Sequence, residues 1–167
     1  MTSAVRPPCF VVCEDGAEYI ERFRRFLGAS FAFVPAHDLG GALDALEVAA
    51  REDGAAASGL LLDLDFRRTP PDRLVDESGR ALAGDEAHVD EGLRRRLTES
   101  QGIFILRALR ARGVGLPAVL FADLADAEQA GFLERTLAPL VVASSRTGLG
   151  EVAALLGRLA SPSGPAT

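Results

Sequence analysis

The strongest constraint on the fold is a regular alternation of short apolar runs with longer amphipathic segments. The apolar runs are residues 9–13, 31–35, 59–66, 117–122 and 140–143. The amphipathic segments, with apolar residues three and four apart, are residues 17–27, 39–51, 103–112, 125–137 and 149–159. The first set is typical of buried strands and the second of surface helices. We therefore predict an α/β fold, a doubly wound five-stranded parallel sheet with helices on both faces.

The length of 167 residues suits a single domain. We predict a core of about residues 9–66 and 101–160, an insertion over about 67–100, and short tails at 1–8 and 161–167. The insertion is rich in charge and is expected to lie outside the core. Inside it, residues 74–75 and 81–82 flank a predicted hairpin turn, and apolar residues at Val89, Leu93 and Leu97 predict a short helix.

The amino-acid composition and net charge limit the kinds of partner that the protein can bind. The net charge is −6, every basic residue is arginine, and no basic stripe is present, which argues against binding to nucleic acid or to an anionic membrane. No apolar stretch is long enough to span a membrane, and the first eight residues lack the apolar region of a secretory signal. We expect a cytoplasmic protein with a protein partner, and reduced core thiols at Cys9 and Cys13.

Acidic residues follow two of the predicted strands. Glu14 and Asp15 follow the first, and Asp63 and Asp65 lie at the end of the third. The carboxyl ends of parallel strands meet at one rim of the sheet, where ligands of such folds bind. Clustered carboxylates attract a hard cation, so Mg²⁺ is a candidate ligand of these four residues. Alternatively, Glu14 and Asp15 cap the first helix, and Asp65 pairs with a nearby arginine of the insertion.

Several of these segments resemble a response-regulator receiver domain. They are residues 10–15, the strand 60–64, and above all residues 101–112 followed by 116–121. The resemblance implies a flavodoxin-like, CheY-like three-layer sandwich. It also implies Asp63 as phosphoacceptor, Glu14 with Asp15 as the magnesium pair, and the Asp65 carbonyl as a further metal ligand. The family uses its last two helices and last strand as a partner or dimer face.

The sequence departs from the family at the positions that translate phosphorylation into movement. Receivers carry Thr or Ser at the end of the fourth strand, where this chain has Ala122, followed by Asp123. Receivers also carry a lysine at the end of the fifth strand, where this chain has Ser144 or Ser145. The resemblance therefore implies an atypical pseudo-receiver, a signalling module that is not an enzyme.

Two other functions remain open. The acids Glu14, Asp63 and Asp65 also resemble the metal site of a Toprim-like, Mg²⁺-dependent nucleic-acid enzyme. Alternatively, the domain is still phosphorylated, with Arg146 or an arginine of the insertion replacing the lysine. The insertion itself follows Asp65 directly and is a lid, a docking surface or a disordered loop.

Overall fold

The five strands form one parallel sheet, as the alternation of apolar and amphipathic segments predicts. The computed structural model describes residues 6–53, 56–82 and 90–161. The strands are β1 (Cys9–Cys13), β2 (Ala32–Ala36), β3 (Gly59–Asp63), β4 (Ala118–Phe121) and β5 (Leu140–Ala143). Their order in the sheet is β2-β1-β3-β4-β5, and every neighbouring pair is parallel. This order confirms the flavodoxin-like, doubly wound fold.

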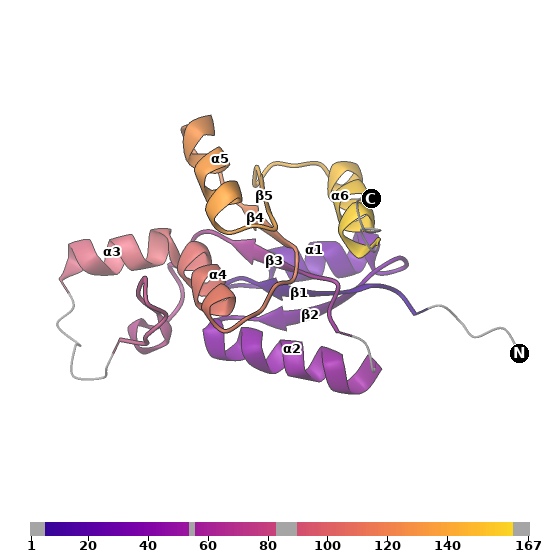
Figure 1. The fold of residues 1–167 in the computed structure, drawn as a ribbon, viewed down its shortest axis with the longest axis horizontal. Coiled ribbons are helices and arrows are strands. Elements are labelled where there is room, and N and C mark those ends of the chain that lie inside the picture. Colours follow the sequence, from indigo (N-terminus) through magenta and orange to yellow (C-terminus); the bar gives the residue numbers. More distant parts are fainter. Residues whose placement is uncertain (1–5, 54–55, 83–89, 162–167) are drawn as a thin grey trace, which may run out of the picture.

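Helices cover the sheet on both faces (Figure 1). They are α1 (Glu18–Leu27), α2 (Leu39–Asp53), α3 (Glu91–Glu99), α4 (Gln101–Ala111), α5 (Ala127–Thr136) and α6 (Leu149–Ala160), with a short 3-10 turn, η1 (Pro71–Arg73). Within the described ranges, no helix combines the length and the apolar character that a membrane span requires.

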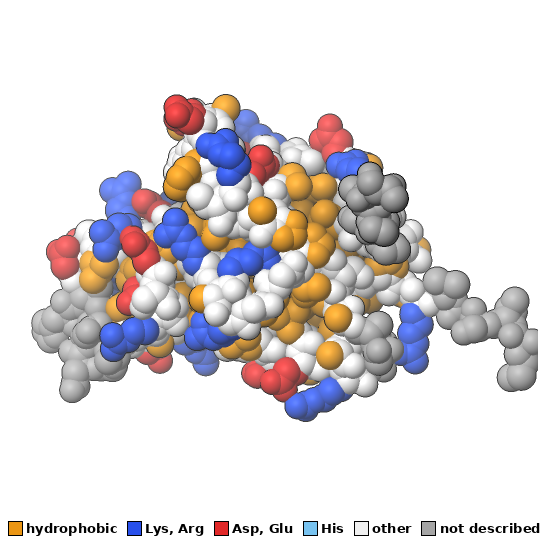
Figure 2. Space-filling model, in the orientation of Figure 1, with side chains coloured by type: hydrophobic (Ala, Val, Ile, Leu, Met, Phe, Trp, Pro, Cys, Tyr) orange, Lys and Arg blue, Asp and Glu red, His pale blue; other side chains and the backbone are white. Residues whose placement is uncertain are grey.

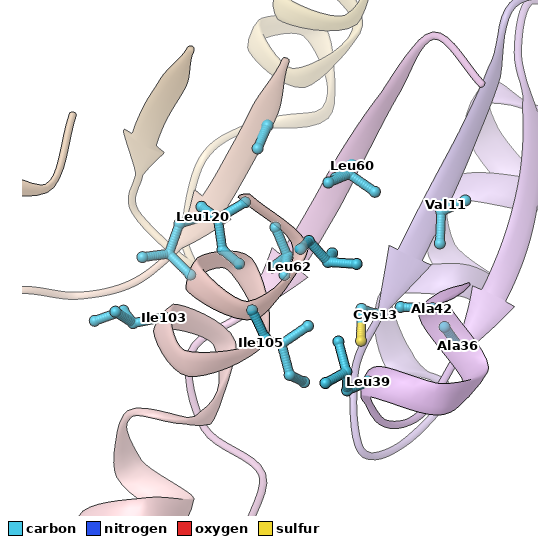
Figure 3. Packing of buried hydrophobic residues seen from close by; sticks show 14 of the residues in the cluster. Val11, Cys13, Ala36, Leu39, Ala42, Leu60, Leu62, Ile103, Ile105 and Leu120 are labelled. Atoms are coloured by element: carbon cyan, nitrogen blue, oxygen red, sulfur yellow. The ribbon is translucent and has the colours of Figure 1, made fainter. Parts of the chain in front are cut away.

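The core consists of two apolar clusters, one on each face of the sheet. Val11, Leu60 and Leu62 belong to the cluster under α2, α4 and α5, whereas Phe10 and Leu61 belong to the cluster under α1 and α6. Neighbouring strand residues enter opposite clusters because side chains alternate across a pleated strand. Figure 3 shows part of the first cluster, where side chains of α2 and α4 meet those of β1, β3 and β4. Strands buried on both faces explain why the apolar runs are continuous.

Strand β3 is shorter than the sequence predicts. The apolar run extends to Phe66, but the strand ends at Asp63. Beyond that point the backbone bonds to α3 and α4 instead of to the sheet: Phe66 N–H donates to Thr98 O of α3 at 2.9 Å, and Gly102 N–H of α4 donates to Leu64 O at 3.2 Å. Phe66 is fully buried. Leu64 and Phe66, on either side of Asp65, are therefore apolar because they pack in the cluster that contains residues of the insertion and of α4.

The expectation that the insertion lies outside the core is wrong for part of it. Leu74, Val75 and Leu97 are buried in the cluster under α2 and α4. The predicted hairpin is confirmed by an antiparallel bridge between Val75 and Ala81. The buried Gln101 side chain binds both backbone groups of Val75, accepting from its N–H at 3.0 Å and donating to its carbonyl at 3.4 Å. Apolar anchors and this amide hold the insertion against the start of α4.

The predicted short helix is also confirmed, as α3, which includes Leu93 and Leu97 and lies beyond the end of the sheet beside α4 (Figure 1). Val89 is outside the described residues. On the face that Figure 2 shows, arginine and acidic side chains are interspersed over α3 and α5, with apolar side chains between them. The described arginine side chains on that face form no extended basic surface.

Candidate functional site

The carboxyl ends of β1, β3, β4 and β5 place the predicted acidic residues at one rim of the sheet. The register pairs Cys13 with Leu62, Asp63 with Phe121, and Phe121 with Ala143. The residues that follow these strands therefore leave the sheet at the same level. They are Glu14 and Asp15 after β1, Leu64 and Asp65 after β3, Ala122 and Asp123 after β4, and Ser144 and Ser145 after β5.

Glu14 caps helix α1, which confirms the capping alternative for this residue. Its carboxylate accepts the backbone N–H of Tyr19 at 3.0 Å and that of Ile20 at 2.8 Å. The first turn of a helix has N–H groups without partners inside the helix, and a carboxylate there also complements the helix dipole. Glu14 is buried, and each of its oxygens accepts one of these bonds. Its principal structural role is to fix the start of α1.

Asp15 binds an arginine of the insertion rather than capping the helix. Arg68 donates to Asp15 through its backbone N–H at 2.7 Å and through its guanidinium at 3.0 and 3.2 Å. The same guanidinium donates to Glu18 at 2.7 and 2.9 Å, and these bonds lower the pKa of Glu18 to about 2. The Asp15 side chain is only 5% exposed. One cation from the insertion therefore binds two carboxylates at the start of the rim.

Asp63 lies at the end of β3, partly buried, with its carboxylate accepting the backbone N–H of Leu64 at 2.8 Å. Burial raises its pKa from 3.8 to about 6, and the negative charges of Asp15 and Glu14 add to that increase. Beside it, the Tyr19 ring stacks on Phe121 with ring centroids 4.9 Å apart. Burial, with Asp63 as the next contribution, raises the pKa of Tyr19 to about 12. Asp63 is thus a carboxylate in an apolar, negatively charged setting.

Replacing Asp63 with asparagine is expected to stabilise the fold near neutral pH. Because the pKa of Asp63 is about 6 in the folded chain and about 3.9 when unfolded, the folded chain binds more protons between these values. Its stability therefore falls as pH rises through that window, and the ionised carboxylate is unfavourable at pH 7. Allowing for solvent screening of a partly exposed group, we expect Asp63→Asn to add on the order of 1 kcal/mol.

Urea denaturation at about pH 7 and about pH 4 measures this effect, since the advantage of Asp63→Asn should shrink at the lower pH. The matched control is Asp44→Asn, which removes the same charge from an exposed position on α2. A loss of stability in Asp63→Asn at neutral pH, or an equal gain in both variants, would contradict the prediction.

Asp65 pairs with a neighbouring arginine, as its alternative role predicts. Arg67 Nε lies 2.7 Å from Asp65 Oδ2, and Arg67 also approaches Glu99 of α3 at 3.8 Å. The other oxygen, Asp65 Oδ1, is buried and has no hydrogen-bond partner among the described residues. Burial raises the pKa of Asp65, whereas Arg67 opposes that increase. Arg67 therefore connects Asp65, just after β3, to Glu99 of α3.

A further cluster, which the sequence does not predict, joins the ends of β4 and β5. The Asp123 carboxylate accepts hydrogen bonds from the Ser144 hydroxyl at 2.6 Å, from the Ser145 backbone N–H at 3.1 Å, and from the Ser145 hydroxyl. These bonds lower the pKa of Asp123, with the Ser144 bond the largest cause. The only signal in the sequence is that an acid and two hydroxyls stand directly after neighbouring predicted strands.

Magnesium, which the receiver resemblance implies, does not fit the rim in this arrangement. Mg²⁺ needs several oxygen ligands in octahedral geometry. In the described part of the chain, no three acidic, His or Cys side chains are grouped closely enough to hold a metal ion. Glu14 is bonded to α1 and Asp15 to Arg68, while Asp63 and Asp65 do not combine with them into a ligand set. We therefore derive no reaction through a metal.

The fold matches that of receiver domains in comparisons with solved structures. The Francisella response regulator 1452 receiver domain has 12% sequence identity and a TM-score of 0.59, with 92% of this chain and 96% of that chain covered. A response regulator receiver protein from Pseudomonas putida has 14% identity and a TM-score of 0.58, covering 93% and 99%. A sensor protein from Polaromonas sp. JS666 has 16% identity and a TM-score of 0.57, covering 93% and 97%.

The chain thus has the CheY-like fold of response-regulator receiver domains. No protein-family model matches the sequence, and no curated protein matches it either. Structural similarity at these low identities shows the fold, and the function has to be argued from the chain's own residues.

Proposed function

We propose that this protein is an atypical, receiver-like signalling module that acts through protein contacts and lacks an efficient phosphorylation switch. The observation that carries the proposal is the cluster of Asp123 with Ser144 and Ser145. It stands at the ends of β4 and β5, where the receiver resemblance implies a free hydroxyl and a lysine.

The chemistry of this cluster opposes a phosphoryl group. The hydroxyl protons of Ser144 and Ser145 are both directed at the Asp123 carboxylate. A phosphoryl group on Asp63 would add negative charge to a rim that already carries several carboxylates. Ala122 has no hydroxyl to bind it. Asp123 therefore links the ends of β4 and β5 without any phosphoryl group. We infer that this link does not depend on the phosphorylation state of the protein.

The two alternative functions receive less support from the geometry. A Toprim-like metal site needs the oxygens of Glu14, and these accept the N–H groups of α1. A phosphorylated receiver with arginine in place of lysine needs a guanidinium beside Asp63. Arg68 instead binds Asp15 and Glu18, and Arg146 is exposed.

The decisive experiment treats the protein with acetyl phosphate or beryllofluoride in the presence of Mg²⁺. We expect no phosphoryl adduct by intact mass spectrometry and no displacement of the amide resonances of α5 and α6. A phosphorylatable receiver domain in the same solution verifies the donor, and Asp63→Asn is the matched variant. An adduct on the unmodified protein that Asp63→Asn abolishes would overturn the proposal.

For the protein contact, we propose the face formed by α5, β5 and α6, through which two copies or a partner would associate. Phe132 of α5 is 50% exposed, and Val141 and Val142 of the edge strand are partly exposed. Glu134 accepts the backbone N–H of Val142 at 2.8 Å. This bond occupies one backbone N–H group on the free edge of β5. Association here would therefore use side chains rather than an added strand.

A further inference from the structure

Arg68 is held at the rim by a buried turn. It lies between Phe66 and Thr69, which are both buried, and Thr69 N–H donates to Phe66 O at 3.1 Å. The turn directs the backbone N–H of Arg68, as well as its side chain, at Asp15. Arg68 therefore differs from an arginine on a mobile surface chain, because its main chain is already fixed when its guanidinium binds.

The position of the Arg68 guanidinium depends on the space above Gly16 as well as on the neighbouring charges. It lies across Gly16, between Asp15 and Glu18. A Cβ at Gly16 would lie 2.3 Å from Arg68 Nη2 and 2.2 Å from Glu18 Oε2. Any side chain at Gly16 would therefore push the guanidinium or Glu18 away. The absence of a Cβ at this position allows the cation to sit over the loop between β1 and α1.

We propose that Arg68 is a tethered cation that occupies the acidic end of β1 and excludes external divalent cations from it. The proposal deepens the proposed function, on which it rests: the insertion closes the rim in cis, so that the module is independent of the metal that receivers use. Arg68 thus joins the insertion to the β1–α1 loop within the same chain.

The physical case depends on competition for Asp15. A tethered group acts at a high effective concentration, and a planar guanidinium satisfies two carboxylates at once with several charge-assisted hydrogen bonds. Mg²⁺ or Mn²⁺ would have to displace these bonds and also find further oxygen ligands. Without Arg68, the nearly buried Asp15 carboxylate would be uncompensated beside Asp63, whose pKa it already raises. A divalent cation would then relieve that repulsion.

The test measures Mn²⁺ binding by titration calorimetry and by paramagnetic broadening of the amide resonances of residues 14–18 and 63–65. We expect Arg68→Gln to bind Mn²⁺ about tenfold more tightly than the unmodified protein, because the competing charge is gone. Gly16→Ala should give a smaller gain without changing any charge, because its Cβ displaces either the guanidinium or Glu18. Arg68→Lys retains the charge but lacks the planar fork that binds two carboxylates, so its gain should be smaller than that of Arg68→Gln.

Arg51→Gln is the control for net charge, since Arg51 pairs with Glu47 on the exposed face of α2. It should leave Mn²⁺ binding unchanged. Equal affinity in Arg68→Gln and the unmodified protein, or an equal gain in Arg51→Gln, would overturn the inference. Phosphorylation of the unmodified protein would instead overturn the proposed function. The two failures are therefore distinguishable.

Discussion

Gly102→Ala is expected to lower the free energy of unfolding by about 3 kcal/mol, as overpacking against a rigid neighbour does. Gly102 is the second residue of α4, and a Cβ on it would lie 1.9 Å from the carbonyl oxygen of Asp63. That oxygen belongs to the backbone of a central strand, so it cannot rotate away as the end of a flexible side chain could. Either α4 or the end of β3 must move. Urea denaturation followed by circular dichroism measures the loss.

The control for Gly102→Ala is Gly157→Ala in α6, where a Cβ would meet nothing within 4 Å. Alanine is favoured over glycine in a helix by up to about 1 kcal/mol, so this variant should be neutral or more stable. The helix preference of alanine also stabilises Gly102→Ala. The expected loss of about 3 kcal/mol is the net value after this gain. A neutral Gly102→Ala would mean that α4 does not contact the backbone of Asp63 as described.

Leu74→Ala is expected to cost about 2 to 4 kcal/mol, although Leu74 lies in the insertion. Its side chain is fully buried in the cluster that α2 and α4 form with the sheet. Truncation removes apolar contacts and leaves a cavity between elements that the rest of the fold holds in place. The midpoint and slope of a urea denaturation curve give the change, which should appear in a single transition.

A substitution in a peripheral appendage would instead change the stability by about 0.5 kcal/mol or less. Phe132→Ala sets that baseline, because it removes a larger side chain that is half exposed on α5. If Leu74→Ala and Phe132→Ala cost the same, the insertion does not share the core. A separate early transition in Leu74→Ala would likewise show an insertion that folds independently of the sheet.

The role of Glu14 was predictable in part, because its place between a strand and a helix is a local feature. A carboxylate four residues before the first helical residue reaches the unpaired N–H groups of the first turn. The pairing of Asp65 with Arg67 is local for the same reason. Both side chains meet partners within a few residues, so the nearby sequence carries the necessary information.

The extent of the core within the insertion was not predictable from its composition. Its charged residues dominate the average and conceal the isolated apolar residues Leu74, Val75 and Leu97. Whether such a residue is buried depends on the path of the chain back to α4. The Gln101 side chain, which binds the backbone of Val75 from 26 residues away, helps to set that path.

The amino-acid sequence alone determined the sheet, its covering helices and the rim where the acids gather, because the burial of each regular element is encoded by the spacing of its own residues. Only the tertiary structure decided which charges meet there. Arg68 binds Asp15 across 53 residues, and Asp123 binds Ser144 and Ser145 across 21 and 22. Such contacts depend on the strand order, the register and the path of the loops together. A local sequence pattern does not encode all three of these features.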